Sequence, residues 1–171
     1  MVTLLKGTSS SWSSTNKASA TILKARKELG TFRENLENMN LLSPTLASLS
    51  DEISNQKVNG GAPAREIFAS GQLIMLTQRL ARSASEFMTP DGINPEKAFL
   101  LGKDANTFYE LVEGFINGSD MHKISATKDA NIKEKLIELQ KNFAEYNKNV
   151  NSILVKLDLF VDAKKAELQI F

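Results

Sequence analysis

The sequence predicts an all-α protein: an antiparallel four-helix bundle in which two long helices extend beyond the other two as a stalk. Apolar residues recur at alternating steps of three and four in four long segments, which is the spacing of one face of a helix. No segment alternates apolar and polar residues between turn signals, as a half-buried strand does. Proline and glycine separate the four segments, so we expect each helix to turn back on the one before it.

Residues 1–14 are predicted to be a flexible polar lead, and residues 15–57 one long helix whose N-cap lies as early as Ser10. The apolar seam of this helix keeps a heptad spacing for five heptads. Pro44 removes one backbone donor, but the apolar phase is the same on both sides of it. We therefore expect a single helix, kinked near Pro44. The seam positions are Ala18, Ile22, Ala25, Leu29, Phe32, Leu36, Met39, Ser43, Leu46, Ser50 and Ile53.

The central segment, residues 64–88, carries two apolar stripes. Pro63 precedes it and Pro90 follows it, which is the usual pattern at helix ends. A surface helix needs only one apolar stripe, so we expect the second to meet another copy of the chain in a homodimer. A core helix enclosed within a monomer is the alternative. One stripe comprises Ala69, Leu73, Leu76, Leu80, Ala84 and Phe87, and the other comprises Ile67, Gly71, Ile74, Ala81 and Met88.

The third and fourth helices follow the same spacing. The third is predicted to begin at Pro95, with Asn94 as its N-cap, and to end near Ile116. The fourth carries an unbroken seam from Ile132 and is expected to continue to Phe171.

Residues 119–129 form a polar connection between these two helices. Its apolar residues Met121 and Ile124 are the expected inward anchors. His122, the one histidine of the chain, is expected to be a solvated loop residue.

Helix lengths predict the stalk. At ~1.5 Å per residue the central and third helices are ~35–40 Å long, whereas the first and last are ~65–70 Å. Four helices can pack together only over the shorter length, so the long pair must continue beyond it. Both chain ends then lie at one pole, as in an inserted sensor module, and the stalk of a second copy would complete a four-helix arrangement. Ile170 and Phe171 are apolar and uncapped, so we expect a piece of a larger protein.

Composition disfavours several function classes. The net charge is +1 with both signs interspersed, so no nucleic-acid partner is expected. The chain lacks cysteine, and one histidine leaves little for a zinc site or a catalytic triad. We find no phosphate-binding loop, no HExxH and no GxSxG. We therefore expect no enzyme, no metal and no cofactor, which leaves binding and signalling.

The segment GQLIMLTQRLAR, from Gly71 to Arg82, resembles the signature G-x-x-R-M-L-S-Q-R-hydrophobic-A-K of the type IV pili methyl-accepting chemotaxis transducer N-terminal domain, the PilJ-type sensor domain. The resemblance covers about 66–171, so we assign residues 63–171 to the sensor module and 15–57 to an inter-module helix. The matching residues are Gly71, Met75, Leu76, Gln78, Arg79 and Ala81, with further similarity at Lys103-Asp104-Ala105, Phe108, Ile116-Asn117-Gly118, Ile124-Ser125 and Leu159-Phe160.

This resemblance implies the second, membrane-proximal periplasmic module of a pilus chemoreceptor anchored in the inner membrane. Such a module would sense a ligand or a partner, for example a pilus subunit, and signal by helix displacement to control twitching. Ser43, Ser50 and Gln78 are expected to weaken seam packing and let register shift. A static scaffold or coiled-coil adaptor is the alternative. The candidate interface or ligand residues are Gly71, Ile74, Met75, Gln78, Arg79 and Arg82.

One position departs from the family. In the nitrate and nitrite sensors that share the signature, the arginine before the methionine binds the anion, but Ile74 stands there in this chain. A buried anion would lose about 1.5–3 kcal/mol of charge-assisted hydrogen bonding per partner. A nitrate-type sensor is therefore disfavoured. Arg79 matches the second arginine but lies about 140° around the helix from Ile74. We expect its stem to pack on Met75 and its head to lie in solvent or pair with Glu86.

Overall fold

The computed structural model describes the backbone of residues 2–89 and 94–170, and within them the side chains of 12–23, 26–89, 94–163, 165 and 166. These residues form five α-helices and no strand, so the protein is all-α as predicted. One isolated β-bridge joins Ser119 to Ile124 within the part described. The helices are α1 (Val2–Asn59), α2 (Ala64–Phe87), α3 (Pro95–Asn117), α4 (Ala130–Val155) and α5 (Leu157–Ile170).

The helix α1 is continuous through Pro44, as its unbroken seam predicts. It begins at Val2, so the expectation of a flexible lead is wrong for residues 2–14, which are helical. The serines and threonines there are only moderate helix formers, but extending an existing helix costs far less than starting one. No proline interrupts the segment, and the helix therefore propagates to its beginning.

The last predicted helix is interrupted at Lys156, which separates α4 from α5, so the expectation of one unbroken helix is wrong. Lys156 has φ −106° and ψ 10°, outside the helical range. The break is local, because Leu157 still packs against the core and Phe160 is buried. Neither proline nor glycine marks the position, which is why periodicity alone predicts an unbroken helix.

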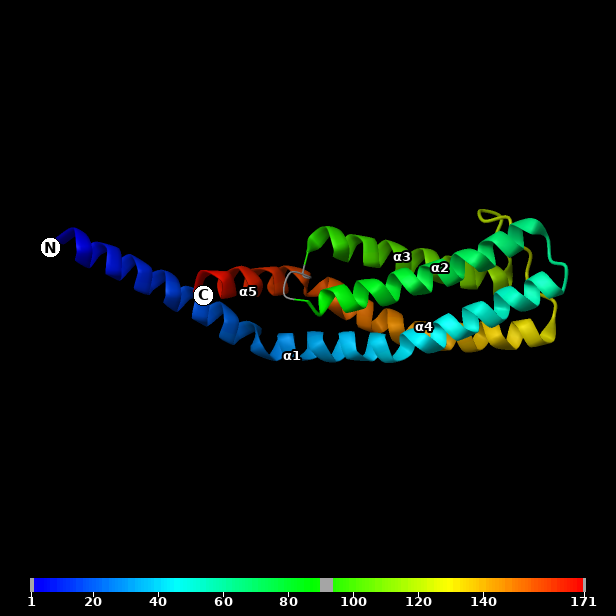
Figure 1. Cartoon of the computed structure of the whole chain (residues 1–171), viewed down its shortest axis with the longest axis horizontal. Coiled ribbons are helices and arrows are strands. Elements are labelled where there is room, and N and C mark those ends of the chain that lie inside the picture. The colour runs from blue at the N-terminus through cyan, green and yellow to red at the C-terminus, as the bar shows by residue number, and fades with distance from the viewer. Residues whose placement is uncertain (1, 90–93, 171) are drawn as a thin grey trace.

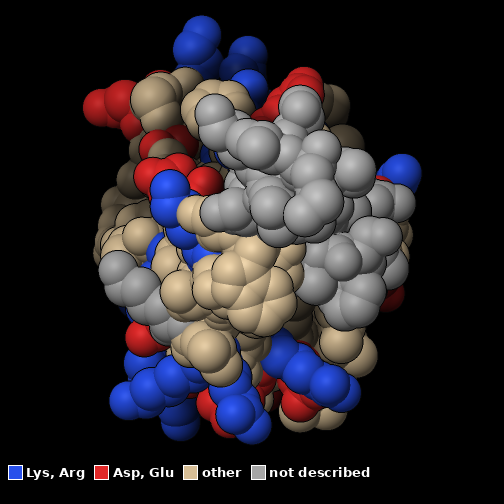
Figure 2. Space-filling model, turned by 90° about the vertical axis from the view of Figure 1, so that its left-hand side faces the viewer, with Lys and Arg blue, Asp and Glu red and all other residues tan. Residues whose placement is uncertain are grey.

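Consecutive helices from α1 to α4 run in opposite directions, and α5 continues the course of α4 (Figure 1). The helix α1 packs against α2, α4 and α5, and α3 packs against α2 and α4. Past the ends of α2 and α3, α1 and α5 continue together, so both ends of the described chain lie at the same end of the molecule (Figure 1). Viewed from that end, basic and acidic side chains are interspersed (Figure 2). No helix within the described residues is long and apolar enough to cross a membrane.

The apolar stripes form one core. Every seam position of α1 from Phe32 to Ile53 is buried, and so is the whole first stripe of α2, as predicted. Aromatic rings join the elements. The centroids of Phe108 and Phe143 lie 4.4 Å apart, and those of Phe32 and Phe160 are separated by the same 4.4 Å.

The ends of α3 follow the sequence signals. Asn94 accepts a hydrogen bond from the Glu96 amide at 2.8 Å, which caps the helix that Pro95 opens. Gly118 has φ 88°, a conformation that favours glycine, and its amide bonds the Gly114 carbonyl at 2.8 Å.

The α3–α4 connection has one inward anchor rather than two. Ile124 is buried at 4% exposure, as expected, but Met121 is 71% exposed and the expectation for it is wrong. The reason is the bridge between Ser119 and Ile124, which closes a tight turn with Met121 near its tip.

We expect Phe143→Ala to lower the free energy of unfolding by about 3–5 kcal/mol, because it opens a cavity between α3 and α4. Phe99→Ala is the matched control. That ring is 70% exposed, so its loss should change stability by about 0.5 kcal/mol or less. Urea unfolding of both variants measures the difference, and equal losses would contradict this description of the core.

Candidate functional site

Four of the signature residues lie on one exposed stripe of α2. Gly71, Met75, Gln78 and Arg82 follow each other at steps of four, three and four, so they share one side of the helix, and all four are exposed. Phe68 continues the stripe by one turn and is 67% exposed. We call these five residues the outer face of α2. Gln78 is thus not a seam residue, contrary to our expectation.

Gly71 leaves the middle of the outer face without a side chain. A Cβ placed at this position would meet nothing within 4 Å, and the backbone there is ordinary helix. Glycine inside a helix costs about 1 kcal/mol relative to alanine. No contact within the described chain uses the missing side chain. Gly71 lies between the exposed Phe68 and Met75 on the outer face.

The second apolar stripe of α2 is only partly covered. Ile67, Ile74 and Ala81 are half-buried along the edge of the core, whereas Gly71 and Met88 are exposed. Within the described chain, α2 is therefore not enclosed on all sides. Ile74, the position of the family's anion-binding arginine, presents only an aliphatic side chain here.

Arg79 joins α2 to α3 through an ion pair. Its guanidinium lies 2.8 Å from the carboxylate of Asp104, whose side chain is only 6% exposed. The expected partner Glu86 is instead paired with Arg82 and Lys97, so that expectation is wrong. Burial raises the pKa of Asp104 above its ordinary value, although Arg79 opposes the shift. Arg79 therefore neutralises a buried charge of its own chain.

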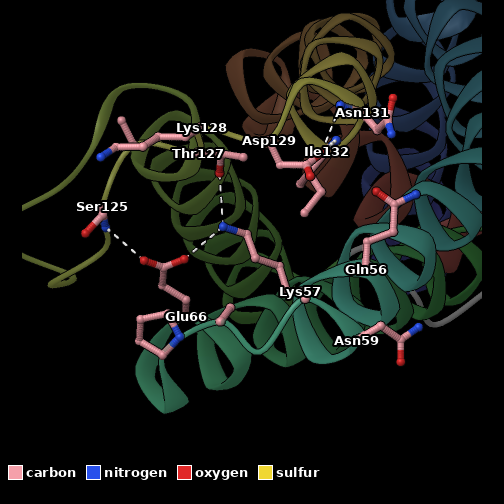
Figure 3. A pocket seen from close by; sticks show the side chains of 14 residues that line it. Gln56, Lys57, Asn59, Glu66, Ser125, Thr127, Lys128, Asp129, Asn131 and Ile132 are labelled. Atoms are coloured by element: carbon pink, nitrogen blue, oxygen red, sulfur yellow. Dashed lines mark hydrogen bonds and ion pairs between the residues drawn. The ribbon is translucent and has the colours of Figure 1, made fainter.

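A second ion pair is buried at the end of the molecule opposite the chain ends. Lys57 of α1 donates to Glu66 of α2 at 2.8 Å and to the Thr127 hydroxyl at 3.0 Å (Figure 3). Its ammonium also lies 4.9 Å above the ring of Phe115. Glu66 accepts the Ser125 amide at 3.4 Å with its other oxygen. The cluster thus ties α1, α2 and the α3–α4 connection together.

Sequence reasoning missed this ion pair, although a signal was present. Lys57 follows Ile53 by four residues and therefore continues the seam of α1. Glu66 likewise falls in phase with Leu73 and Leu80 on the buried side of α2. Opposite charges at two seam positions flanking a glycine turn would have predicted a buried pair.

An open pocket of about 660 Å³ lies beside this ion pair. We call it the polar pocket. Its walls come from the end of α1, the start of α2, the α3–α4 connection and the start of α4 (Figure 3). Gln56 of α1 and Asn131 of α4 extend toward one another on one side of it, and Lys57 with Glu66 forms the other side (Figure 3).

His122 lies beside an acidic residue in the α3–α4 connection. Among the described residues no three His, Cys, Asp or Glu side chains are grouped to hold a metal ion. His122 is half-buried rather than fully solvated, with its Nε2 atom 3.6 Å from a carboxylate oxygen of Glu110.

Comparison with known proteins finds a relative of this chain. No family model matches the chain. The chain is similar to Protein PilJ of Pseudomonas aeruginosa, with 25% identity over 118 residues. That match covers 68% of this chain but 17% of PilJ, so the chain corresponds to only a part of that protein. The likeness supports a PilJ-like relationship.

We expect Arg79→Ala to destabilise the protein by about 1–3 kcal/mol at pH 7, because the Asp104 carboxylate remains buried without its cation. A carboxyl whose pKa is raised on folding opposes folding once it ionises, so the loss should shrink as pH falls from 7 to 4.5. Urea unfolding at both pH values measures it. Arg82→Ala, which removes a side chain that is 81% exposed, should show a much smaller loss. A pH-independent loss for Arg79→Ala would contradict the role assigned to Asp104.

Proposed function

We propose that this chain is the ligand- or partner-sensing periplasmic part of a methyl-accepting chemotaxis transducer that controls type IV pilus responses. The similarity to PilJ over 68% of the chain carries this proposal. The signature from Gly71 to Arg82 supports it. Of its six matching residues, Gly71, Met75 and Gln78 lie on the exposed outer face of α2, and Arg79 pairs with α3. The parent protein would be anchored in the inner membrane, and this chain would be its second, membrane-proximal periplasmic module.

The arrangement of the helices suits such a role. The pairings of α1 with α2 and α4, and of α3 with α2 and α4, support an antiparallel four-helix bundle. Among the described helices only α1 and α5 extend beyond it, toward the end where the chain begins and ends (Figure 1). A signal would leave through these two helices as a small shift or rotation of one against the other.

The α1–α2 interface contains small hydroxyl residues that would permit such a shift. The Ser70 hydroxyl donates to Ser54 at 3.1 Å across the interface, and Ser50 and Thr77 are also buried. The Ser50 oxygen finds no hydrogen-bond partner among the described residues. Small hydroxyl side chains can exchange hydrogen-bond partners when one helix slides past another. The free-energy difference between neighbouring registers is therefore smaller than where leucine side chains interlock.

The proposed function is tested by exchange. In P. aeruginosa PilJ, the matching segment is replaced by this chain and twitching motility is measured. A sensory module should restore motility, whereas a chimera carrying an unrelated antiparallel bundle of the same length should not. Equal motility in both chimeras would favour the alternative of a static scaffold. The full reading frame supplies a second check, since a transducer needs a membrane span before this chain and a signalling helix after it.

We further propose that the chain forms a homodimer through the outer face of α2. Phe68 and Met75 supply apolar area, and Gly71 lets a second helix approach closely. Association of the isolated chain would be weak, because a few apolar contacts offset only part of the association cost. In the membrane the tether raises the effective concentration and would favour the dimer.

Met75→Asp should therefore abolish self-association in sedimentation velocity at high protein concentration, while circular dichroism stays unchanged. Ile137→Asp is the matched control. Ile137 is 50% exposed on α4, away from the outer face, and its replacement should leave self-association intact. A Met75→Asp protein with unchanged self-association would refute this interface.

We propose that the molecule recognised by the dimer is a pilus subunit rather than nitrate, as the family resemblance suggests. Ile74 offers no hydrogen-bond donor, and Arg79 is engaged with Asp104. Calorimetry with nitrate and nitrite should accordingly detect no binding at dissociation constants of tens of micromolar or tighter. Binding in that range would reinstate the small-anion sensor.

A further inference from the structure

The break between α4 and α5 is a change in hydrogen bonding at one residue. The Lys156 amide bonds the Ile153 carbonyl at 3.2 Å, which is a spacing of three residues rather than the four of an α-helix. The Phe160 amide then bonds the Lys156 carbonyl at 3.2 Å, and the spacing of four resumes. A short stretch of the tighter spacing within a long helix often marks a hinge.

The sequence around Lys156 does not require the break. The apolar seam passes through it in phase, because Ile153, Leu157 and Phe160 follow each other at steps of four and three. Lysine itself is a good helix former, and neither proline nor glycine lies nearby. The broken and the unbroken helix therefore both suit this sequence, and the choice between them depends on tertiary contacts.

An ion pair with α1 holds Lys156 at the break. Its ammonium is paired with the carboxylate of Glu28, and the two side chains are only 35% and 30% exposed. Partial burial reduces the screening of the two charges by solvent. A change in the direction of the chain at Lys156 would draw this pair apart. The ion pair therefore favours the broken form.

The helix α1 has a weak point at the same level of the molecule. Gly30 lies two residues after Glu28 and two before Phe32. The first is paired with Lys156, and the ring of the second contacts that of Phe160. Glycine weakens a helix, yet a Cβ at Gly30 would meet nothing within 4 Å, so no close contact requires it. The course of α1 changes direction in its N-terminal half (Figure 1).

We propose that Gly30 and Lys156 form a two-helix hinge, and that the ion pair of Lys156 with Glu28 stabilises its bent form. The hinge joins the four-helix bundle to the stalk, which consists of residues 2–29 of α1 together with α5. On the bundle side, Asn35 donates to Ser152 at 2.8 Å and fixes α1 to α4.

Separation of the ion pair lets the helix through Lys156 become regular, and the stalk then swings relative to the bundle. Two helices can swing together only if both bend at one level, which Gly30 and Lys156 provide. The use of this motion as a signal rests on the proposed function, whereas the hinge itself does not.

The hinge is tested by distances between spin labels. The chain lacks cysteine, so labels attach only where cysteines are introduced. Lys148→Cys marks α4 in the bundle and Lys165→Cys marks α5 in the stalk, at side chains that are 77% and 70% exposed. Double electron–electron resonance on the 171-residue chain should give one narrow distance distribution. Glu28→Gln should widen it to about twice that width, because both forms of the hinge become populated.

Two comparisons make the result specific to the hinge. Arg33→Gln removes an exposed ion pair of the same helix and should leave the distribution unchanged. Gly30→Ala, added to Glu28→Gln, should narrow the distribution again, because alanine strengthens α1 and its methyl group has free space. Labels at Lys133 and Lys148, both within α4, should report the same distance in every variant.

Two results would overturn the hinge. One is a distribution between Lys148 and Lys165 that is equally narrow with and without Glu28→Gln, which would show a static kink. The other is a broadening that Gly30→Ala does not reverse, which would exclude α1 from the hinge. These distances are measured on the isolated chain, so the outcome of the PilJ chimera leaves them unaffected and the two proposals are judged separately.

Discussion

Burial of the apolar seam of α1 is the constraint on which the rest of the structure depends. This helix has 58 residues, and no other helix is half that long. Several partners must therefore cover it in succession. The helices α2 and α4 pack along its C-terminal part, and α5 packs where Phe32 meets Phe160. Because α4 and α5 follow each other along one seam, the path of the last two helices is a consequence of the first.

Two ion pairs then set the rotation of α2 about its own axis. Lys57 holds it to α1 through Glu66, and Asp104 holds it to α3 through Arg79. Buried ion pairs add little net stability, because desolvation offsets their attraction, but breaking one is costly. Their main physical effect here is to oppose rotation of α2 that would separate either pair. The outer face with Phe68, Gly71 and Met75 is what this orientation leaves exposed.

The outer face of α2 and the polar pocket differ in chemistry. The outer face of α2 exposes the apolar Phe68 and Met75 beside the polar Gln78 and Arg82, which suits a helix of a second molecule. The polar pocket is lined mainly by charged and amide side chains, from the end of α1, the start of α2, the α3–α4 connection and the start of α4.

The sequence by itself determined the helices, their inward faces and most of their ends, because these depend on residues three and four positions apart and on local caps such as Asn94 and Gly118. It also placed Gly71, Met75 and Arg82 in one signature. Only the tertiary structure decided the partner of Arg79, the pairing of Lys57 with Glu66 and Thr127, and the break at Lys156. These features join residues from different helices or depend on how helices fit together. The helical repeat of 3.6 residues determines which side chains share a face of a helix. Tertiary packing decides which neighbouring helix covers that face and how much of it is buried.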